Sequence, residues 1–228
     1  MKKILSKIAL FDNLDKETID SLSTISKIKE YKKGDLLYSN KEKINTIYLI
    51  LEGVVGLYKA NSDNSRKVIF LLGQNNIINE VILFENITTL SCEMLTTTKL
   101  LEIPRLEFLK ILENNNSLSK IIIESLIKKN KKLTHQLKNI SNSITVDRQI
   151  AFKLWKLGRD FGKETPEGII IDFDLPITYL AEMLGAKRET VSRQVKLLSK
   201  LGLISINKKR FILHRYSELL DYFHKDSK

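Results

Sequence analysis

Three residues at fixed spacing, Ala181, Gly185 and Val191, limit most narrowly what this chain can fold into. They predict two helices, over residues 177–184 and 188–201, joined by a tight turn. A small alanine lets the helices approach, a glycine can adopt the positive φ of the turn, and a branched valine fills the angle between the helices. This spacing is typical of a helix-turn-helix.

The second of these helices has an apolar face, extended by Val195 and Leu198, and an opposite polar face. The first two turns of such a helix reach base edges in the major groove of DNA. Arginine can donate two hydrogen bonds to guanine and glutamate can accept one from cytosine; each good pair discriminates by roughly 1–3 kcal/mol. We therefore predict four base-reading residues: Arg188, Glu189, Ser192 and Arg193. The alternative is a solvated face on which Glu189 and Arg193 form an i,i+4 ion pair.

A basic hairpin is expected after the second helix, with strands over 203–206 and 211–213 and Lys208, Lys209 and Arg210 at its tip. Residues 185–215 hold nine basic side chains and one acidic one, and the whole chain carries +11. Such an excess favours a polyanionic partner, either nucleic acid or an anionic membrane surface. We expect six residues to contact DNA phosphates: Thr178, Lys187, Thr190, Lys196, Lys208 and Lys209.

The first part of the chain differs in residue pattern and has almost no net charge, with 16 basic and 15 acidic residues over 1–116. A short helix is predicted over 12–28, with Asp15 as its N-cap. Short apolar runs separated by turn residues then predict strands at 36–38, 47–51, 54–58, 68–72 and 99–103. Several such strands favour an antiparallel roll or barrel, which often encloses a ligand cavity.

A long helix is predicted over 104–140, and its second half carries apolar residues in alternating steps of three and four. This heptad pattern predicts a two-helix coiled coil, in which the polar Asn130 would set the register. The alternative is a helix that packs on its own domain. We read Lys128, Lys129, Lys131 and Lys132 as a solvated face. The predicted dimer seam consists of Ile123, Leu126, Asn130, Leu133, Leu137 and Ile140.

The fold class that results is α+β: an N-terminal antiparallel β-roll, a long coiled-coil dimerisation helix and a C-terminal winged helix-turn-helix. We expect a sensing domain over 1–116, the dimerisation helix and a hinge over 117–144, and a DNA-binding domain over 145–228. The hinge is placed at 141–143, where serine and asparagine interrupt the heptads. A helix over 148–161 and a strand over 169–175 complete the last domain.

Several classes of protein are excluded by simple counts. The single Cys92 rules out an intramolecular disulfide scaffold and an all-cysteine zinc or iron–sulfur site, and we expect it to be a small buried residue. No apolar run reaches the roughly 18–20 residues of a membrane span, and no signal-peptide cleavage site follows the start, so we expect a cytoplasmic protein. A cupin-like metal enzyme needs clustered histidines, and none occurs before His135. A basic protein on anionic lipid is the third alternative.

Residues 180–193 (LAEMLGAKRETVSR) closely resemble the helix-turn-helix of the CRP/FNR superfamily of bacterial transcription regulators. The segments 147–151 (DRQIA), 201–204 (LGLI), 33–35 (KGD) and 48–55 (YLILEGVV) fit the same family in the same order. The resemblance implies a non-enzymatic homodimer that binds a two-fold symmetric DNA operator and recruits or blocks RNA polymerase. It also implies base reading by Arg188, Glu189 and Arg193, on half-sites with a TGA-like core.

The resemblance is weaker where cyclic-AMP-binding members hold their ligand, through a Gly-Glu pair and an Arg-Ser pair. Here Asn79 replaces the glycine beside Glu80, and Thr88 and Thr89 stand near the place of the Arg-Ser pair. A buried phosphate without a cationic partner pays a large desolvation cost. We therefore expect an unknown small-molecule effector other than cyclic AMP. The residues proposed for its pocket are Asn79, Glu80, Thr88, Thr89 and Thr134 of the dimer helix.

The sequence does not identify a cofactor or effector. The cysteine cluster of the oxygen-sensing branch is missing, so we expect no protein-ligated iron–sulfur cluster and no other metal site. A regulator that depends on a cyclic nucleotide or on haem is the alternative. His135 is a conceivable haem ligand, although a single histidine on a charged helix is usually solvated. A small organic anion, an aromatic effector, nitric oxide acting through haem, and no ligand at all are the other possibilities.

Overall fold

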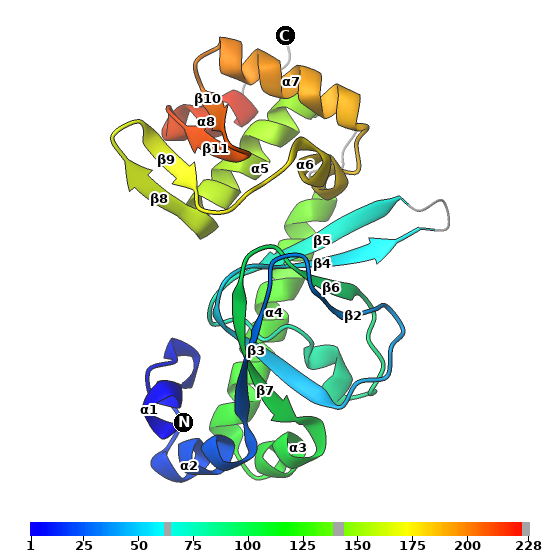
Figure 1. The fold of residues 1–228 in the computed structure, drawn as a ribbon, viewed down its shortest axis with the longest axis vertical. Helices are drawn as coiled ribbons and strands as arrows, with labels where there is room; N and C mark the ends of the chain where they lie inside the picture. Colours follow the sequence, from blue (N-terminus) through cyan, green and yellow to red (C-terminus); the bar gives the residue numbers. More distant parts are fainter. Residues whose placement is uncertain (62–64, 139–143, 225–228) are drawn as a thin grey trace. The chain divides into compact units, whose positions relative to one another are not determined.

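The computed structural model describes residues 1–61, 65–138 and 144–224 of the chain, which is a mixture of helices and antiparallel sheets (Figure 1). Its contacts group into two compact units. The first unit comprises Met1–Lys59 and Phe70–His135, and the second comprises Ala60–Ile69 and Gln136–Lys228. The domain limits expected at 116 and 144 stay predictions, and the predicted hinge at 141–143 lies outside the described residues.

The chain begins with three short helices, α1 (Lys2–Leu5), η1 (Ala9–Phe11) and α2 (Lys16–Ile25). Asp15 is the N-cap of α2, as predicted, since its carboxylate accepts hydrogen bonds from the Thr18 amide at 2.7 Å and hydroxyl at 2.9 Å. The predicted end of this helix at 28 is wrong. The backbone becomes extended at Ser26, because the following residues pair with a distant strand that local periodicity does not reveal.

Seven strands form the roll in two antiparallel sheets, ordered β1-β7-β3 and β2-β6-β4-β5. Their bounds are β1 (Lys27–Tyr31), β2 (Leu36–Tyr38), β3 (Thr46–Glu52), β4 (Val55–Ala60), β5 (Arg66–Leu72), β6 (Ser91–Met94) and β7 (Thr98–Pro104). The five predicted strands are all present, which confirms the β-roll. The prediction missed β1 and β6, which are short and carry several polar residues. Buried side chains between the sheets include Leu49, Ile50, Val55, Met94, Leu100 and Leu101.

The single long helix predicted over 104–140 is wrong, because the structure has two helices, α3 (Arg105–Glu113) and α4 (Asn116–Lys138). The break lies at Asn114 and Asn115. The Asn115 side chain accepts a hydrogen bond from the Leu118 amide at 2.8 Å, so it caps the start of α4. Asparagine competes with the helical backbone in this way, which is why it favours helix ends over helix interiors. The short helix η2 (Glu80–Leu83) lies earlier in the chain, between β5 and β6.

The second unit contains four more helices and a four-stranded antiparallel sheet of order β10-β11-β9-β8. Its elements are α5 (Val146–Phe161), β8 (Gly162–Thr165), β9 (Gly168–Ile171), α6 (Ile177–Leu184), α7 (Arg188–Lys200), β10 (Ile204–Asn207), β11 (Arg210–Leu213) and α8 (Tyr216–His224). The helix-turn-helix and hairpin agree with prediction. The strand predicted over 169–175 ends at Ile171, and the sequence analysis missed β8 and α8.

No helix in the described parts of the chain is long and apolar enough to cross a membrane.

Candidate functional site

The turn between α6 and α7 has the geometry that the spacing of small and branched residues predicts. Gly185 adopts φ +69°, and its amide donates to the Ala181 carbonyl, which ends α6. Ala181 is buried, and Val191 is fully buried between the helices. Val195 and Leu198 continue this buried face along α7. One face of α7 therefore packs into the core of its unit, and the opposite face points away from that core.

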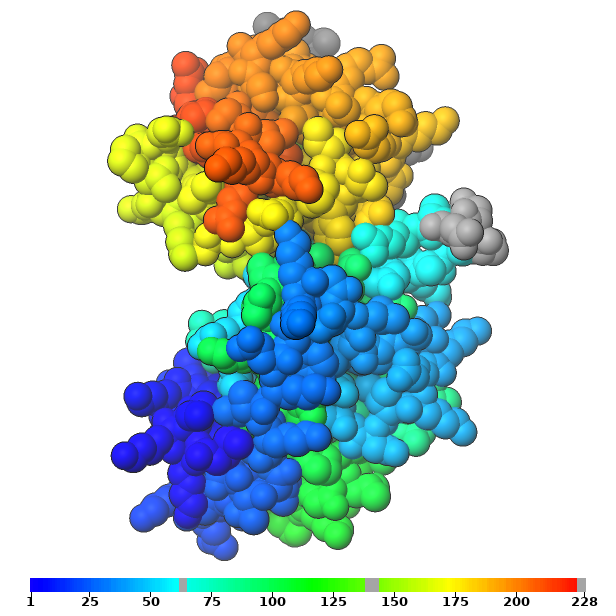
Figure 2. Space-filling view, viewed as in Figure 1, coloured from blue at the N-terminus to red at the C-terminus, as the bar shows by residue number. Residues whose placement is uncertain are grey.

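The opposite face of α7 is exposed, and it carries the residues predicted to read bases. Arg188, Glu189 and Arg193 are exposed, whereas Ser192 is half-buried at the edge of the face. Among the residues that the structure describes, Glu189 and Arg193 do not form the i,i+4 ion pair that was the alternative reading. The helix lies at the surface of its unit, where it is drawn in orange (Figures 1 and 2). The arginine side chains thus remain available to an external partner.

The β10–β11 hairpin ends in a two-residue turn made by Lys208 and Lys209, both exposed and both with positive φ. The Lys209 carbonyl accepts a hydrogen bond from the Leu175 amide at 2.8 Å, which ties the tip to the segment before α6. Arg210, which was expected at the basic tip, instead pairs with Asp172 at 3.1 Å within the unit. The tip therefore presents two cations rather than three.

The other predicted phosphate contacts lie around the same helices. Thr178 is exposed in the first turn of α6, Lys187 is exposed just before α7, and Lys196 is exposed on α7. Thr190 is only half-buried, on the side of α7 next to the base-reading face. Exposed cations and hydroxyl groups flanking a helix are the groups that usually contact DNA phosphates.

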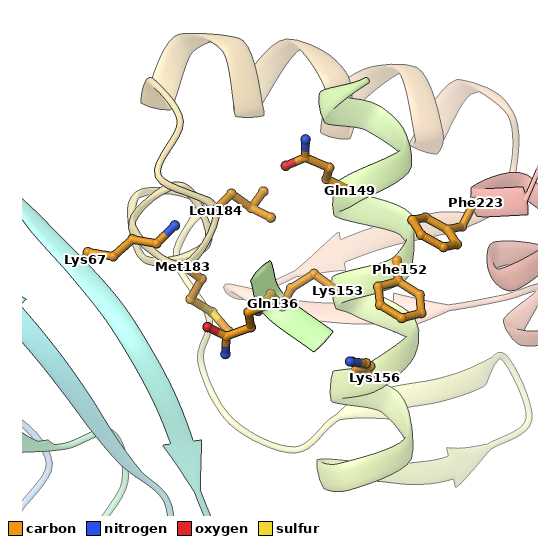
Figure 3. A pocket seen from close by; sticks show the side chains of 9 residues that line it. All are labelled: Lys67, Gln136, Gln149, Phe152, Lys153, Lys156, Met183, Leu184 and Phe223. Carbon is orange, nitrogen blue, oxygen red and sulfur yellow. The ribbon is translucent and has the colours of Figure 1, made fainter. Parts of the chain in front are cut away.

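A small pocket that the sequence analysis did not anticipate lies in the second unit (Figure 3). Phe152 and Phe223 contribute aromatic surface to it, and Lys67 contributes an ammonium group whose pKa is lowered by burial. It holds about 70 Å³, which is enough for a few water molecules and well below the several hundred Å³ of ligand sites. The full lining is Lys67, Gln136, Gln149, Phe152, Lys153, Lys156, Met183, Leu184 and Phe223.

In the first unit, Glu80 is the residue of the predicted effector pocket that reaches α4. Its side chain is only 2% exposed, and one carboxylate oxygen accepts a hydrogen bond from the Ser125 hydroxyl. The other oxygen pairs with the ammonium group of Lys129, which also donates to the Ile78 carbonyl at 3.0 Å. Burial lowers the pKa of Lys129, and the negative charge of Glu80 works in the opposite direction.

This ion pair corrects the reading of the lysine run as a solvated face. Lys128 and Lys131 are exposed as expected, but the Lys129 side chain is only 14% exposed. It lies on the side of α4 that also buries Leu118, Ile122 and Ser125. The lysine spacing could not show this, because the acidic partner lies 49 residues earlier in the chain.

The remaining candidates for the effector pocket bond to the backbone or are exposed, and their place in a pocket with Glu80 stays a prediction. Asn79 is buried and bonds to the backbone, accepting from the Tyr48 amide at 3.0 Å and donating to the Thr46 carbonyl at 2.9 Å. Thr88 is buried and donates to the Ser39 carbonyl at 2.6 Å. The other two, Thr89 and Thr134, are exposed, and the Thr134 hydroxyl donates to the Asn130 carbonyl of its own helix at 3.1 Å.

The predicted dimer seam lies on the solvent-exposed side of α4. Leu137 is 71% exposed, and Asn130 is exposed in the middle of the seam. The other described members of the seam, Ile123, Leu126 and Leu133, are exposed as well, and Ile140 lies outside the described residues. The alternative of a helix packed on its own domain accounts for the buried side of α4 but leaves this apolar stripe uncovered.

Cys92 and His135 are the two remaining candidate residues. Cys92 is fully buried in β6, which confirms it as a small core residue, and burial raises the pKa of its thiol. His135, the conceivable haem ligand, is exposed on α4. In the described ranges, no group of three or more histidine, cysteine or carboxylate side chains is arranged to hold a metal ion.

Both parts of the chain match models of known protein families. The family model for the cyclic nucleotide-binding domain matches residues 28–115, and the model for the Crp-like helix-turn-helix domain matches residues 148–222. The chain belongs to the CRP/FNR family of transcription regulators. As a CRP/FNR-type regulator it combines an effector-binding type of domain with a DNA-binding helix-turn-helix domain.

Curated relatives of this CRP/FNR regulator cover most of its length. It is 26% identical over 187 residues to the global nitrogen regulator of Synechococcus elongatus, covering 80% of this chain and 83% of that protein. It is 19% identical over 214 residues to the CRP-like cAMP-activated global transcriptional regulator of Mycobacterium tuberculosis, covering 93% and 95%. The structure of FixK2 from Bradyrhizobium japonicum shares the fold with a TM-score of 0.76 at 16% identity, covering 89% of this chain and all of that one.

Proposed function

We propose that this CRP/FNR regulator binds as a homodimer to a two-fold symmetric operator whose half-sites contain a TGA-like core, and that it acts on RNA polymerase there. The exposed base-reading face of α7 carries the proposal, because its opposite face is buried in the unit while Arg188 and Arg193 remain unpaired in the described structure. A helix held in this way can enter the major groove without rearrangement of its own unit.

The exposed stripe on α4 supports the homodimer. Leu126, Leu133 and Leu137 recur at heptad spacing, and a second α4 would remove them from water. The stripe lies roughly a quarter of a turn around the helix from the buried side, so a partner helix and the roll can both pack against α4. Two copies then present two α7 helices, which matches an operator with two half-sites about one helical turn apart.

Control of DNA binding is proposed to come from the roll, in response to a signal other than cyclic AMP. The Asn79 and Thr88 side chains bond to the roll's own backbone. No cationic residue stands at positions 88 and 89, where the family's cyclic-AMP-binding members hold the cyclic phosphate with an arginine. Addition of cyclic AMP is therefore expected to leave operator affinity unchanged, as measured by fluorescence anisotropy.

Selection of bound sequences from a pool of randomised duplexes tests the operator directly. We expect enrichment of paired TGA-like half-sites, centred about 10–10.5 base pairs apart or a multiple of that spacing. Enrichment of no sequence, or of a single unpaired half-site, would contradict the homodimeric operator reading.

The Arg193→Ala variant tests the base-reading face on the selected operator. Loss of one bidentate base contact is expected to weaken operator binding about tenfold to hundredfold, in line with roughly 1–3 kcal/mol per contact. Affinity for random duplexes should change little. Lys200→Ala, an exposed cation at the end of the same helix, is the matched control and should keep the ratio of specific to non-specific affinity. Equal losses on both kinds of duplex in Arg193→Ala would refute the assignment.

A further inference from the structure

The carboxylate of Glu80 is buried in the roll and requires hydrogen-bond donors there. The residue is 4% exposed, and an ionised carboxylate at that depth is costly unless donors surround it. Both oxygens have a donor, and both donors, Ser125 and Lys129, come from α4. The acidic group of the roll is therefore satisfied by the helix that carries the dimer seam.

Lys129 is suited to this role by its chemistry as well as its position. An ammonium group has three donors and no acceptor. Here it donates to the Glu80 carboxylate and to the Ile78 carbonyl, both in the segment that leads into and begins η2. The acceptors converge on one cation, so this part of the roll is a site for a primary ammonium group.

The surrounding polar groups are satisfied within the chain. Asn79, next to Glu80, bonds to the backbone of β3, and Thr88 bonds to the segment around Ser39. The polar group that turns toward α4 is Glu80. Its partner is Lys129, whose side chain is only 14% exposed, in a run whose members Lys128 and Lys131 are exposed.

We propose that Lys129 is a tethered ligand: its ammonium group fills the acidic site of the roll in place of a small-molecule effector and holds α4 against the roll in the DNA-binding state. This inference rests on the proposed control of DNA binding by the roll. A tethered group competes at a high local concentration, so the wild-type protein binds its operator without any added small molecule.

Chemical rescue tests the ammonium site without DNA. Lys129→Ala leaves Glu80 buried without its counter-ion and opens a space the length of the lost side chain. We expect a lower melting temperature for this variant, restored in part by millimolar n-propylammonium chloride but not by equal sodium chloride or tetramethylammonium chloride. Lys128→Ala, which removes an exposed neighbour, is the matched control and should show neither effect. An unchanged melting temperature, or a loss that propylammonium does not reverse, overturns the proposal.

A double variant keeps the test decisive if Lys129→Ala does not fold. Lys129→Met fills the space without charge and leaves Glu80 unpaired, whereas Glu80→Gln combined with Lys129→Met removes both charges. Removing both partners of a buried pair costs less than removing one. The double variant is therefore expected to melt at a higher temperature than Lys129→Met alone, and the reverse order overturns the proposal.

DNA binding supplies the second readout. On the operator selected above, we expect the wild-type protein to bind without added ligand. We expect Lys129→Ala to lose tenfold or more in operator affinity and to regain affinity when propylammonium is added. If the variant binds its operator as tightly as wild type, the role of Lys129 in holding the DNA-binding state is wrong. If the wild-type protein selects no sequence while propylammonium still restores the melting temperature of Lys129→Ala, the proposed function fails and the ammonium site stands.

Discussion

Lys208 and Lys209 occupy the two central positions of the β10–β11 turn, and both have positive φ, at +45° and +67°. A non-glycine residue in this region costs roughly 1–2 kcal/mol relative to its preferred conformation. Asn-Gly is the pair that two-residue hairpin turns favour. Lysine at both positions therefore lowers the stability of the turn while placing two cations at its tip.

The double variant Lys208→Asn with Lys209→Gly separates stability from DNA binding. We expect the free energy of unfolding to rise by about 1 kcal/mol, since the turn loses its strain. We also expect weaker DNA binding and a salt dependence of log K that is shallower by about 2, one phosphate contact being lost per lysine. Thermal melts and binding titrations at several salt concentrations measure both. Lys120→Gln, an exposed charge of the first unit, is the control and should leave the salt slope unchanged.

Cys92 is the one thiol of the chain, and its burial in β6 raises its pKa. The thiolate is the reactive form, so a raised pKa and a lack of access both slow reaction. At pH 8 we expect a thiol-specific reagent to label the native protein very slowly and the urea-denatured protein at once, with one thiol per chain. Rapid labelling of the native protein would show that β6 opens readily and that Cys92 can act as a redox sensor.

At the scale of the element, α4 has two faces with different surroundings. The face with Leu118, Ile122 and Lys129 packs on the roll, and the face with Leu126 and Leu133 is exposed at heptad spacing. A helix that contacts the roll and a partner helix can convert a change at Glu80 into a change in how two chains are held together. The buried ion pair and the predicted seam thus belong to one mechanical element.

Asn130→Leu tests the seam of α4. Asparagine at a seam position usually fixes the register and lowers stability, so leucine should tighten the dimer by several-fold or more. Sedimentation equilibrium at a series of concentrations measures the dissociation constant. Leu106→Asn, an exposed apolar residue on α3, serves as the control and should leave it unchanged. A monomeric wild-type protein, or a weaker dimer in Asn130→Leu, would contradict the seam.

At the scale of the whole molecule, the basic charge is divided between internal pairing and an exposed surface. Arg148 donates to the Phe223 carbonyl at 2.7 Å, and Arg210 pairs with Asp172, so these cations help hold the second unit together. Arg188, Arg193 and the two lysines of the turn are exposed. The net charge of +11 therefore overstates the cationic surface available to DNA, whereas the positions on α7 and the hairpin tip describe it directly.

The helix-turn-helix and most of the roll could be predicted from the sequence alone. Ala181, Gly185 and Val191 determine structure locally, because each contacts or shapes neighbouring residues of the same helix-turn-helix. The apolar runs of β3, β4 and β5 are equally local. In contrast, β1 and β6 are defined by pairing with strands far along the chain, and their short polar sequences carry little signal of their own.

The burial of Lys129 was decided by tertiary contacts. In a run of four lysines each position looks solvated, and the one that is buried is the one whose side chain meets Glu80 and the Ile78 carbonyl. Residue spacing alone thus determined which face of α7 and which stripe of α4 are exposed. Only the packed structure decided which group lies against the buried carboxylate of Glu80. Burying a charge costs a large desolvation free energy unless a counter-charge lies beside it, and here a distant segment of the chain supplies that counter-charge.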